Sequence, residues 1–254
     1  MDLATNLLAL DLGNSRLKAA FLVGEKITNF SLESSDLEKN LGSLFKEISL
    51  CGKLQGIILC SVQPSSTENL CKEAKKAFGL EPVIVDQILL EKLGLKTETV
   101  GAGNDRLATA YGLWLEYRQN LLIADFGTAI TLDAINLEGE FLGGSISPGL
   151  KLCAEALKNE TAQLFEVPLE PPKEVIGKNT TQAMQSGIIL GNAYMTKCLA
   201  EKFARHCACD FYKIVTGGSV KLVHPYLGEE WDAQENATIL ALKNIYTAVK
   251  GFQP

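Results

Sequence analysis

The sequence predicts an α/β protein built from two duplicated domains, and a pair of similar stretches carries that prediction. Residues 121–135, LLIADFGTAITLDAI, are typical of a buried strand, a glycine turn and a half-buried second strand. Residues 7–21, LLALDLGNSRLKAAF, repeat this pattern about one small domain earlier. Both first strands end in Asp-x-Gly. So short a match can arise by chance, but the second strands also agree in length and alternation, which favours duplication.

The order of elements in the first half supports this fold class. The pattern predicts a hairpin over 7–23 and then, in order, a helix over 36–48, a strand over 54–62, a helix over 65–78 and a strand over 82–85. This order is typical of one half of an actin-like protein, a ribonuclease-H-like domain. We therefore expect two ribonuclease-H-like domains, at residues 1–118 and 119–254, with the active site in the cleft between them.

Composition narrows the class of protein. The chain has 254 residues, of which 46% are hydrophobic and 21% charged, as in globular domains. The net charge of -6 and the lack of a long basic run argue against nucleic acid or an anionic membrane as partner. Seven scattered cysteines suggest reduced thiols, and no signal peptide or membrane span is visible, so we expect a cytoplasmic protein.

Three segments of the second half have an open interpretation. The sequence FLGGSISPG, residues 141–149, leads into a helix predicted over 150–164 and is either an ordinary turn or an anion site at a helix start, the latter slightly favoured. A long helix is predicted from residue 179 to about 205, where Thr180 is either a helix cap or a substrate contact. The strand over 211–215 ends in TGGS, where bare backbone could approach adenosine, and a helix over 235–249 closes the chain.

Two aspartates stand out chemically. Asp125 ends a buried strand beside Gly127 and Thr128, an arrangement suited to holding a phosphate-bound cation. Asp105 precedes a helix predicted to run to about Tyr117, so the residues alone favour a helix cap. The alternative is a carboxylate that acts in a cleft, with Arg106 beside it as an anion donor.

The joint order of these motifs resembles one family. The motifs occur as DLGNSRLK (residues 11–18), GNDR (103–106), DFGT (125–128) and TGGS (216–219), together with GGSISPG and GKNTTQAMQSG. This set resembles the type III pantothenate kinases of the acetate and sugar kinase/Hsp70/actin superfamily. Such enzymes use ATP to phosphorylate pantothenate, the first step of coenzyme A synthesis.

The resemblance implies specific roles. Asp105 is then the catalytic base, and Asp125 lies at a site for a monovalent cation, K⁺ or NH₄⁺. Mg²⁺ accompanies ATP, and the protein is a homodimer. The implied ATP contacts are Asp11, Gly13, Asn14, Ser15, Arg16, Lys18 and Thr128. The implied pantothenate contacts are Gly103, Asn104, Asp105, Arg106 and Thr180.

One segment departs from the family pattern. The family carries Tyr-x-Asn-Pro before its G-x-D-R motif, whereas KTETVG, residues 96–101, has neither Tyr nor Pro. This departure falls on the substrate side. It leaves open a sugar kinase or phosphatase of the same superfamily that acts on another small hydroxyl compound. The resemblance also leaves open a non-catalytic accessory factor in transcription, although the net charge of -6 does not suggest the basic groove that such a role would use.

Overall fold

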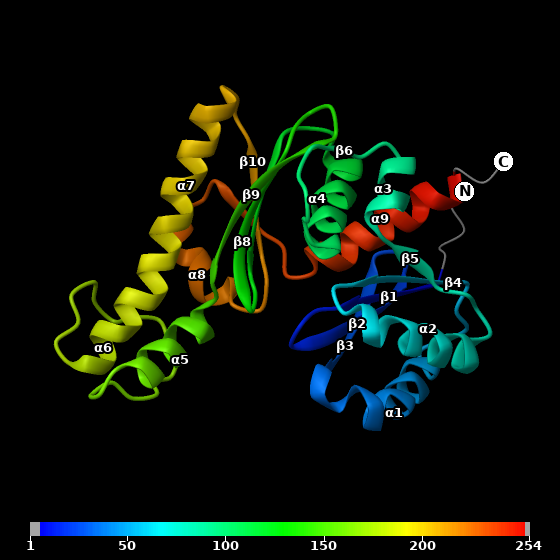
Figure 1. Cartoon of the computed structure of the whole chain (residues 1–254), viewed down its shortest axis with the longest axis horizontal. Coiled ribbons are helices and arrows are strands. Elements are labelled where there is room, and N and C mark those ends of the chain that lie inside the picture. Colours follow the sequence, from blue (N-terminus) through cyan, green and yellow to red (C-terminus); the bar gives the residue numbers. More distant parts are fainter. Residues whose placement is uncertain (1–5, 252–254) are drawn as a thin grey trace. The chain divides into compact units, whose positions relative to one another are not determined.

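The computed structural model describes residues 6–251, and they form two compact units. The first unit comprises residues up to Tyr117 together with those from Ala237 onward, and the second comprises Arg118–Asn236. Figure 1 shows the whole chain coloured along the sequence. No helix of the described part is long and apolar enough to cross a bilayer.

The first unit is built on a five-stranded sheet in the order β3-β2-β1-β4-β5. The strands β1, β2 and β3 are antiparallel neighbours, whereas β1, β4 and β5 run parallel. The elements are β1 (Leu7–Leu12), β2 (Arg16–Val23), β3 (Lys26–Glu33), a 3-10 turn (Ser34–Asp36), α1 (Leu37–Ser49), β4 (Gly56–Ser61), α2 (Pro64–Phe78), β5 (Val83–Val85), α3 (Gln87–Lys92), β6 (Lys96–Thr97), α4 (Asn104–Tyr117) and α9 (Ala237–Gly251).

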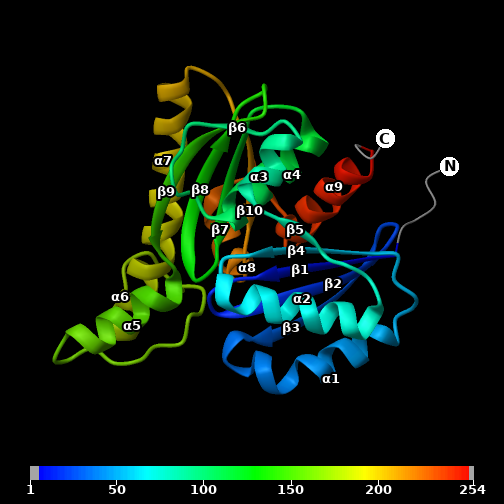
Figure 2. The ribbon, with the colours of Figure 1, turned by 45° about the vertical axis from the view of Figure 1, so that its right-hand side comes forward.

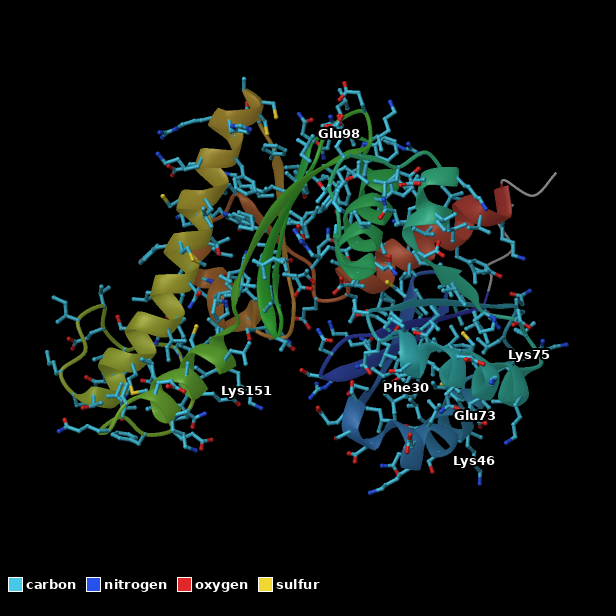
Figure 3. The ribbon with its side chains drawn as sticks, viewed as in Figure 1. Phe30, Lys46, Glu73, Lys75, Glu98 and Lys151 are labelled. Carbon is cyan, nitrogen blue, oxygen red and sulfur yellow. The ribbon has the colours of Figure 1, made fainter. Side chains whose placement is uncertain are left out.

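Helices cover both faces of this sheet. Helices α1 and α2 pack on one face through a core that includes Leu8, Phe45 and Leu70, and α4 and α9 lie on the other (Figure 2). Strand β1 is buried along its whole length, as its apolar run requires. Charged residues of the outer helices, such as Lys46 on α1 and Lys75 on α2, lie at the surface (Figure 3).

The C-terminal helix does not follow the expected division at residue 118, which assigned it to the second domain. Helix α9 packs on α4, where Gly112 leaves no room for a side chain because a Cβ there would lie 2.3 Å from the Ala241 oxygen. Tyr246 lies over Gly56 of β4, and the Asn244 amide donates to the Gly112 carbonyl at 3.0 Å. The chain therefore returns to the first unit after Asn236.

The second unit repeats the same sheet order, β9-β8-β7-β10-β11, with the same antiparallel and parallel pairs. Helices α5, α7 and α8 pack against one face of this sheet (Figure 1). The elements are β7 (Leu121–Phe126), β8 (Ala129–Ile135), β9 (Glu140–Pro148), α5 (Leu150–Glu160), α6 (Thr180–Gln185), a π-helical turn (Ser186–Leu190), α7 (Gly191–Cys207), β10 (Tyr212–Thr216), α8 (Val220–Leu227) and β11 (Trp231–Ala233).

This shared order agrees with the duplication that the two hairpins suggested. Each unit has a hairpin whose first strand ends in Asp-x-Gly, a third antiparallel strand, and two parallel strands on the other side. Strands β3 and β11 were not predicted. The residues of β3 are half-buried or exposed and none is buried, and β11 has only three residues. The predicted helix over 150–164 ends at Glu160, and the long helix from 179 is interrupted by the π-helical turn.

Candidate functional site

The turn between β1 and β2 presents exposed backbone next to a buried carboxylate. Asp11 is only 7% exposed, whereas Asn14 and Ser15 at the tip of the turn are exposed. The Gly13 N–H donates to the Arg16 carbonyl at 3.0 Å and closes the turn. The hairpin register places Asp11 opposite Lys18, whose ammonium nitrogen lies 3.9 Å from Asp11 Oδ2.

The two basic residues of this hairpin differ in their partners. The Lys18 side chain is 45% exposed, and its 3.9 Å contact with Asp11 places its charge at the mouth of the turn. Arg16 pairs with Glu33, which faces it across the β2–β3 ladder. A role for Arg16 in binding phosphate would therefore compete with this exposed ion pair, which is weak.

Asp105 lies in the first turn of α4, one residue after the helix begins at Asn104. The Gly103 carbonyl accepts the N–H of Leu107, so the helical hydrogen bonds begin at Gly103. Asp105 Oδ1 accepts the adjacent N–H of Arg106 at 2.9 Å. A Cβ at position 103 would lie 2.5 Å from that oxygen, so glycine is what allows the carboxylate to fold back over the loop. Asp105 is therefore the second residue of the helix and not the residue before it, and its carboxylate accepts one N–H of the first turn.

A buried thiol relates Asp11 to Asp105. Cys60 of β4 pairs with Asp11 in the parallel ladder and is fully buried. Burial raises the pKa of the Cys60 thiol well above its ordinary value, and the carboxylates of Asp11 and Asp105 raise it further. Asp11 and Asp105 therefore both lie near Cys60, toward the carboxyl end of β4. The first unit thus brings two of the predicted functional aspartates together.

The turn between β7 and β8 is the counterpart in the second unit. The Gly127 N–H donates to the Ala129 carbonyl at 3.0 Å, and Gly127 and Thr128 are exposed. The Oδ1 atom of Asp125 is shielded from solvent. The carboxylate thus lies beneath the turn, while the Thr128 residue is at its surface.

Two glycine-marked segments, at the starts of α5 and α8, close around this turn. A Cβ at Gly149 would lie 2.3 Å from the Thr128 carbonyl oxygen, and the Gly149 N–H donates to that oxygen at 3.1 Å. A Cβ at Gly217 would lie 2.4 Å from Asp125 Oδ1, and its φ of 103° is one that side chains disfavour. The expected TGGS segment is thus in contact with the DFGT turn, a relation that no sequence signal indicated.

The glycines of the FLGGSISPG segment have different roles inside strand β9 and before helix α5. Gly143 and Gly144 lie inside strand β9, and a Cβ at Gly144 would lie 2.1 Å from the Leu132 carbonyl oxygen of β8. Gly144 therefore allows β9 to pack closely against β8. Gly149, in contrast, is the residue before α5, and its N–H donates to the Thr128 carbonyl of the second turn.

Thr180 lines an open pocket of about 440 Å³ near the start of α6. The cap of this helix is Asn179, whose side chain accepts the Gln182 N–H at 2.9 Å, so Thr180 does not have the capping role. The pocket mixes apolar and polar walls. It is lined by Phe165, Pro168, Glu170, Pro171, Lys173, Asn179, Thr180, Thr181, Gln182 and Gln185.

The donor atoms at both turns suit hard cations. Within residues 6–251, no cluster of three or more His, Cys, Asp or Glu side chains could hold a metal. A Cβ at Gly127 would lie 3.4 Å from Asp125 Oδ1 and 3.6 Å from the Ala129 carbonyl oxygen, and carbonyl oxygens are ligands that K⁺ takes in proteins. Asp11 likewise offers a carboxylate next to the exposed tip of its turn, and Mg²⁺ is held in proteins by one or two carboxylates plus substrate phosphates.

Comparison with solved structures identifies the fold. The chain is similar to the ethanolamine utilization protein EutJ from Carboxydothermus hydrogenoformans, with a TM-score of 0.54, 13% identity and coverage of 94% of this chain and 88% of the other. It is also similar to Ta0583, an archaeal actin homolog, with a TM-score of 0.54, 14% identity and coverage of 97% and 100%. The predicted actin-like fold is confirmed.

Sequence comparison identifies the family. A protein from Thermomicrobium roseum named type III pantothenate kinase is 29% identical over 250 residues, which cover 94% of this chain and 96% of that protein. One of the same name from Streptomyces avermitilis is 32% identical, with coverage of 94% and 97%. The family model described as type III pantothenate kinase matches residues 7–202, which include both hairpin turns and Asp105. The chain therefore belongs to the type III pantothenate kinase family.

Proposed function

We propose that this protein transfers the γ-phosphoryl group of ATP to pantothenate and forms 4′-phosphopantothenate, which enters coenzyme A synthesis. The observation that carries the proposal is the family match over residues 7–202. It spans Asp11, Asp105 and Asp125, the three acidic residues to which the proposal gives chemical roles.

Phosphoryl transfer needs positioning and charge neutralisation more than covalent chemistry. We assign phosphate binding to the backbone and side chains of the first turn, with Lys18 supplying a positive charge. This is supported by the exposure of Asn14 and Ser15 and by the half-exposed ammonium of Lys18. Thr128, exposed at the tip of the second turn, would add a hydroxyl contact. The remaining proposed phosphate contacts are Asp11, Gly13 and Arg16, the last of which must leave Glu33 to take part.

Asp105 is proposed as the base that accepts the proton of the pantothenate hydroxyl. A base must reach the proton that it removes, and one Asp105 oxygen is held by the Arg106 N–H while the residue as a whole is partly exposed. Gly103, Asn104 and Arg106 around it, and Thr180 in its pocket, are the proposed pantothenate contacts.

The proposed cations are Mg²⁺, bound with ATP, and K⁺ or NH₄⁺ at Asp125. When bound, they would neutralise phosphate charge. The position of the Asp125 carboxylate depends on Gly217, because a Cβ there would lie 2.4 Å from Asp125 Oδ1. We also propose a cytoplasmic homodimer. The exposed glycines Gly187 and Gly191, which have no neighbour within 4 Å of a Cβ, offer a flat helix surface that suits a partner subunit.

The test is a product assay on the full chain. ATP, Mg²⁺ and K⁺ are supplied with pantothenate, and in parallel with a panel of small hydroxyl compounds including sugars, and products are identified by mass spectrometry. We expect 4′-phosphopantothenate as the main product. Phosphorylation of another compound instead would favour the related kinase that the altered segment 96–101 leaves open. A folded protein that binds ATP and phosphorylates nothing would favour the non-catalytic accessory factor.

A further inference from the structure

Gln63 connects the first hairpin turn to the start of helix α2. Its side-chain nitrogen Nε2 donates to the carbonyls of Gly13 at 2.6 Å and Asn14 at 3.2 Å. The same nitrogen lies 3.3 Å from Ser34 Oγ, and Ser34 Oγ itself donates to the Gly13 carbonyl. The assignment of nitrogen and oxygen is required by chemistry, since two carbonyl oxygens need a donor.

The rest of Gln63 is fixed by its surroundings. Its Oε1 accepts the Ser66 hydroxyl at 3.1 Å, and its backbone N–H donates to Ser61 Oγ at 3.0 Å. The backbone carbonyl accepts the N–H groups of Ser66 and Thr67, the first bonds of α2. The side chain has no part in capping that helix. The start of α2 thus holds Gln63 in place, with its Nε2 directed at the carbonyls of the first turn.

The bond to the Gly13 carbonyl determines where the N–H of Asn14 points. In a planar trans peptide, the carbonyl of one residue and the N–H of the next point in opposite directions. The chain has no cis peptide among the described residues. Since Gln63 holds the carbonyl of Gly13, the N–H of Asn14 in the same peptide is directed away from Gln63, on the exposed tip of the turn.

We propose that Gln63 is a positioning residue for the triphosphate: by holding the carbonyls of Gly13 and Asn14, it preorganises the Asn14 N–H of the first turn as a donor to a phosphate oxygen. The proposal rests on the proposed use of ATP. It involves no contact between Gln63 and the nucleotide. It therefore predicts an effect that depends on the phosphates and is absent for the base and ribose.

The experiment compares Gln63→Met with the wild type. Methionine keeps the length of the side chain and removes its donors. Binding of the non-hydrolysable ATP analogue AMP-PNP with Mg²⁺, and of adenosine, is measured by calorimetry. We expect the dissociation constant for AMP-PNP to rise about tenfold, the effect of losing roughly one hydrogen bond, while that for adenosine stays the same. In turnover assays, the KM for ATP rises and the KM for pantothenate does not.

Gln55→Met is the matched control. Gln55 precedes β4 as Gln63 follows it, and its Oε1 accepts the Asn6 N–H at 2.7 Å, away from the turn. It should leave AMP-PNP binding unchanged. Equal AMP-PNP affinity of wild type and Gln63→Met would overturn the inference alone, as would an equal loss for adenosine and AMP-PNP. A wild type that binds AMP-PNP but does not phosphorylate pantothenate would overturn only the proposed function. No AMP-PNP binding by the wild type would overturn both.

Discussion

The two hairpin turns have the same topology and are supported in different ways. In the first unit, the strand next to Asp11 continues through Val62, whose N–H donates to Leu12, into Gln63 at the start of α2. In the second unit, the strand next to Asp125 continues into Ser219 at the start of α8, and the Ser219 N–H donates to Phe126. The backbone pattern is therefore repeated, and the residues at the helix start differ.

The difference lies in how the space beside each turn is used. A long side chain, Gln63, reaches the carbonyls of the first turn. The second turn has Gly149 and Gly217 so close that backbone touches backbone. A duplicated fold thus keeps its strand order while the contacts that hold its loops are free to diverge. The consequences for substitution differ accordingly in the two units.

The largest expected effect is on kcat, and it comes from an acidic residue that the second unit lacks at the start of its helices. Only the first unit has an acidic residue in the first turn of a helix near its hairpin, since α5, α6, α7 and α8 have none. Replacing Asp105 by Asn removes the proposed base and should lower kcat by about 10²- to 10⁴-fold. AMP-PNP affinity should not change. Steady-state kinetics with calorimetry measures both, and near-normal turnover would remove Asp105 from catalysis.

The next effect tests the close packing of the second turn. Gly217→Ala forces a Cβ against Asp125 and the Phe126 backbone at a positive φ, and should lower the free energy of unfolding by about 2–4 kcal/mol. Gly218→Ala is the control, because a Cβ there meets nothing within 4 Å. In the first turn, Gly13→Ala brings its Cβ only to 3.4 Å from the Arg16 oxygen and should cost far less. Urea denaturation of all three variants checks the order.

A smaller effect is expected at Gly103, where the first unit also has a glycine packed closely against an aspartate. Gly103→Ala places a Cβ 2.5 Å from Asp105 Oδ1 and must displace that carboxylate. Because a misplacement of about 1 Å can cost roughly 100-fold in rate, we expect kcat to fall about 10- to 100-fold with little change in unfolding free energy. Single-turnover rates together with thermal melts measure this. An unchanged rate would mean that the carboxylate position is not critical.

The smallest effect is on the pH dependence of stability. The residue paired with Asp11 is Cys60, an ionisable thiol, whereas the residue paired with Asp125 is Thr216, which does not titrate. Burial raises the pKa of Cys60 well above 9.0, so on alkaline titration the unfolded chain loses this proton first. The stability that the neutral thiol contributes is present below the unfolded pKa and is lost as the pH rises toward the folded one, by up to about 1.4 kcal/mol per pH unit. Cys60→Ala should flatten this slope, measured by denaturation at several alkaline pH values. An equal slope would contradict the assignment.

The hairpins and most helices could be predicted from the sequence because their periodicity is strong. Strands β1 and β7 begin with apolar runs, and α4 ends at Tyr117 as its pattern indicated, although it begins at Asn104, where a cap was expected. The aspartates could be found because Asp-x-Gly follows each run. The place of α9 could not be predicted, because it is decided by contacts between residues far apart in the sequence, such as Gly112 with Ala241 and Gly56 with Tyr246. The contact of Gly217 with Asp125 joins distant segments and leaves no local signal.

The central claim is that both copies of the turn bind the phosphates of ATP, and one titration series tests it most directly. AMP-PNP with Mg²⁺ is titrated into the wild type, Asp11→Asn and Thr128→Val, and the dissociation constant is compared with that for adenosine. The account predicts weaker AMP-PNP binding in both variants, with adenosine binding unchanged. If either variant bound AMP-PNP as tightly as the wild type, that turn would have no part in holding the triphosphate.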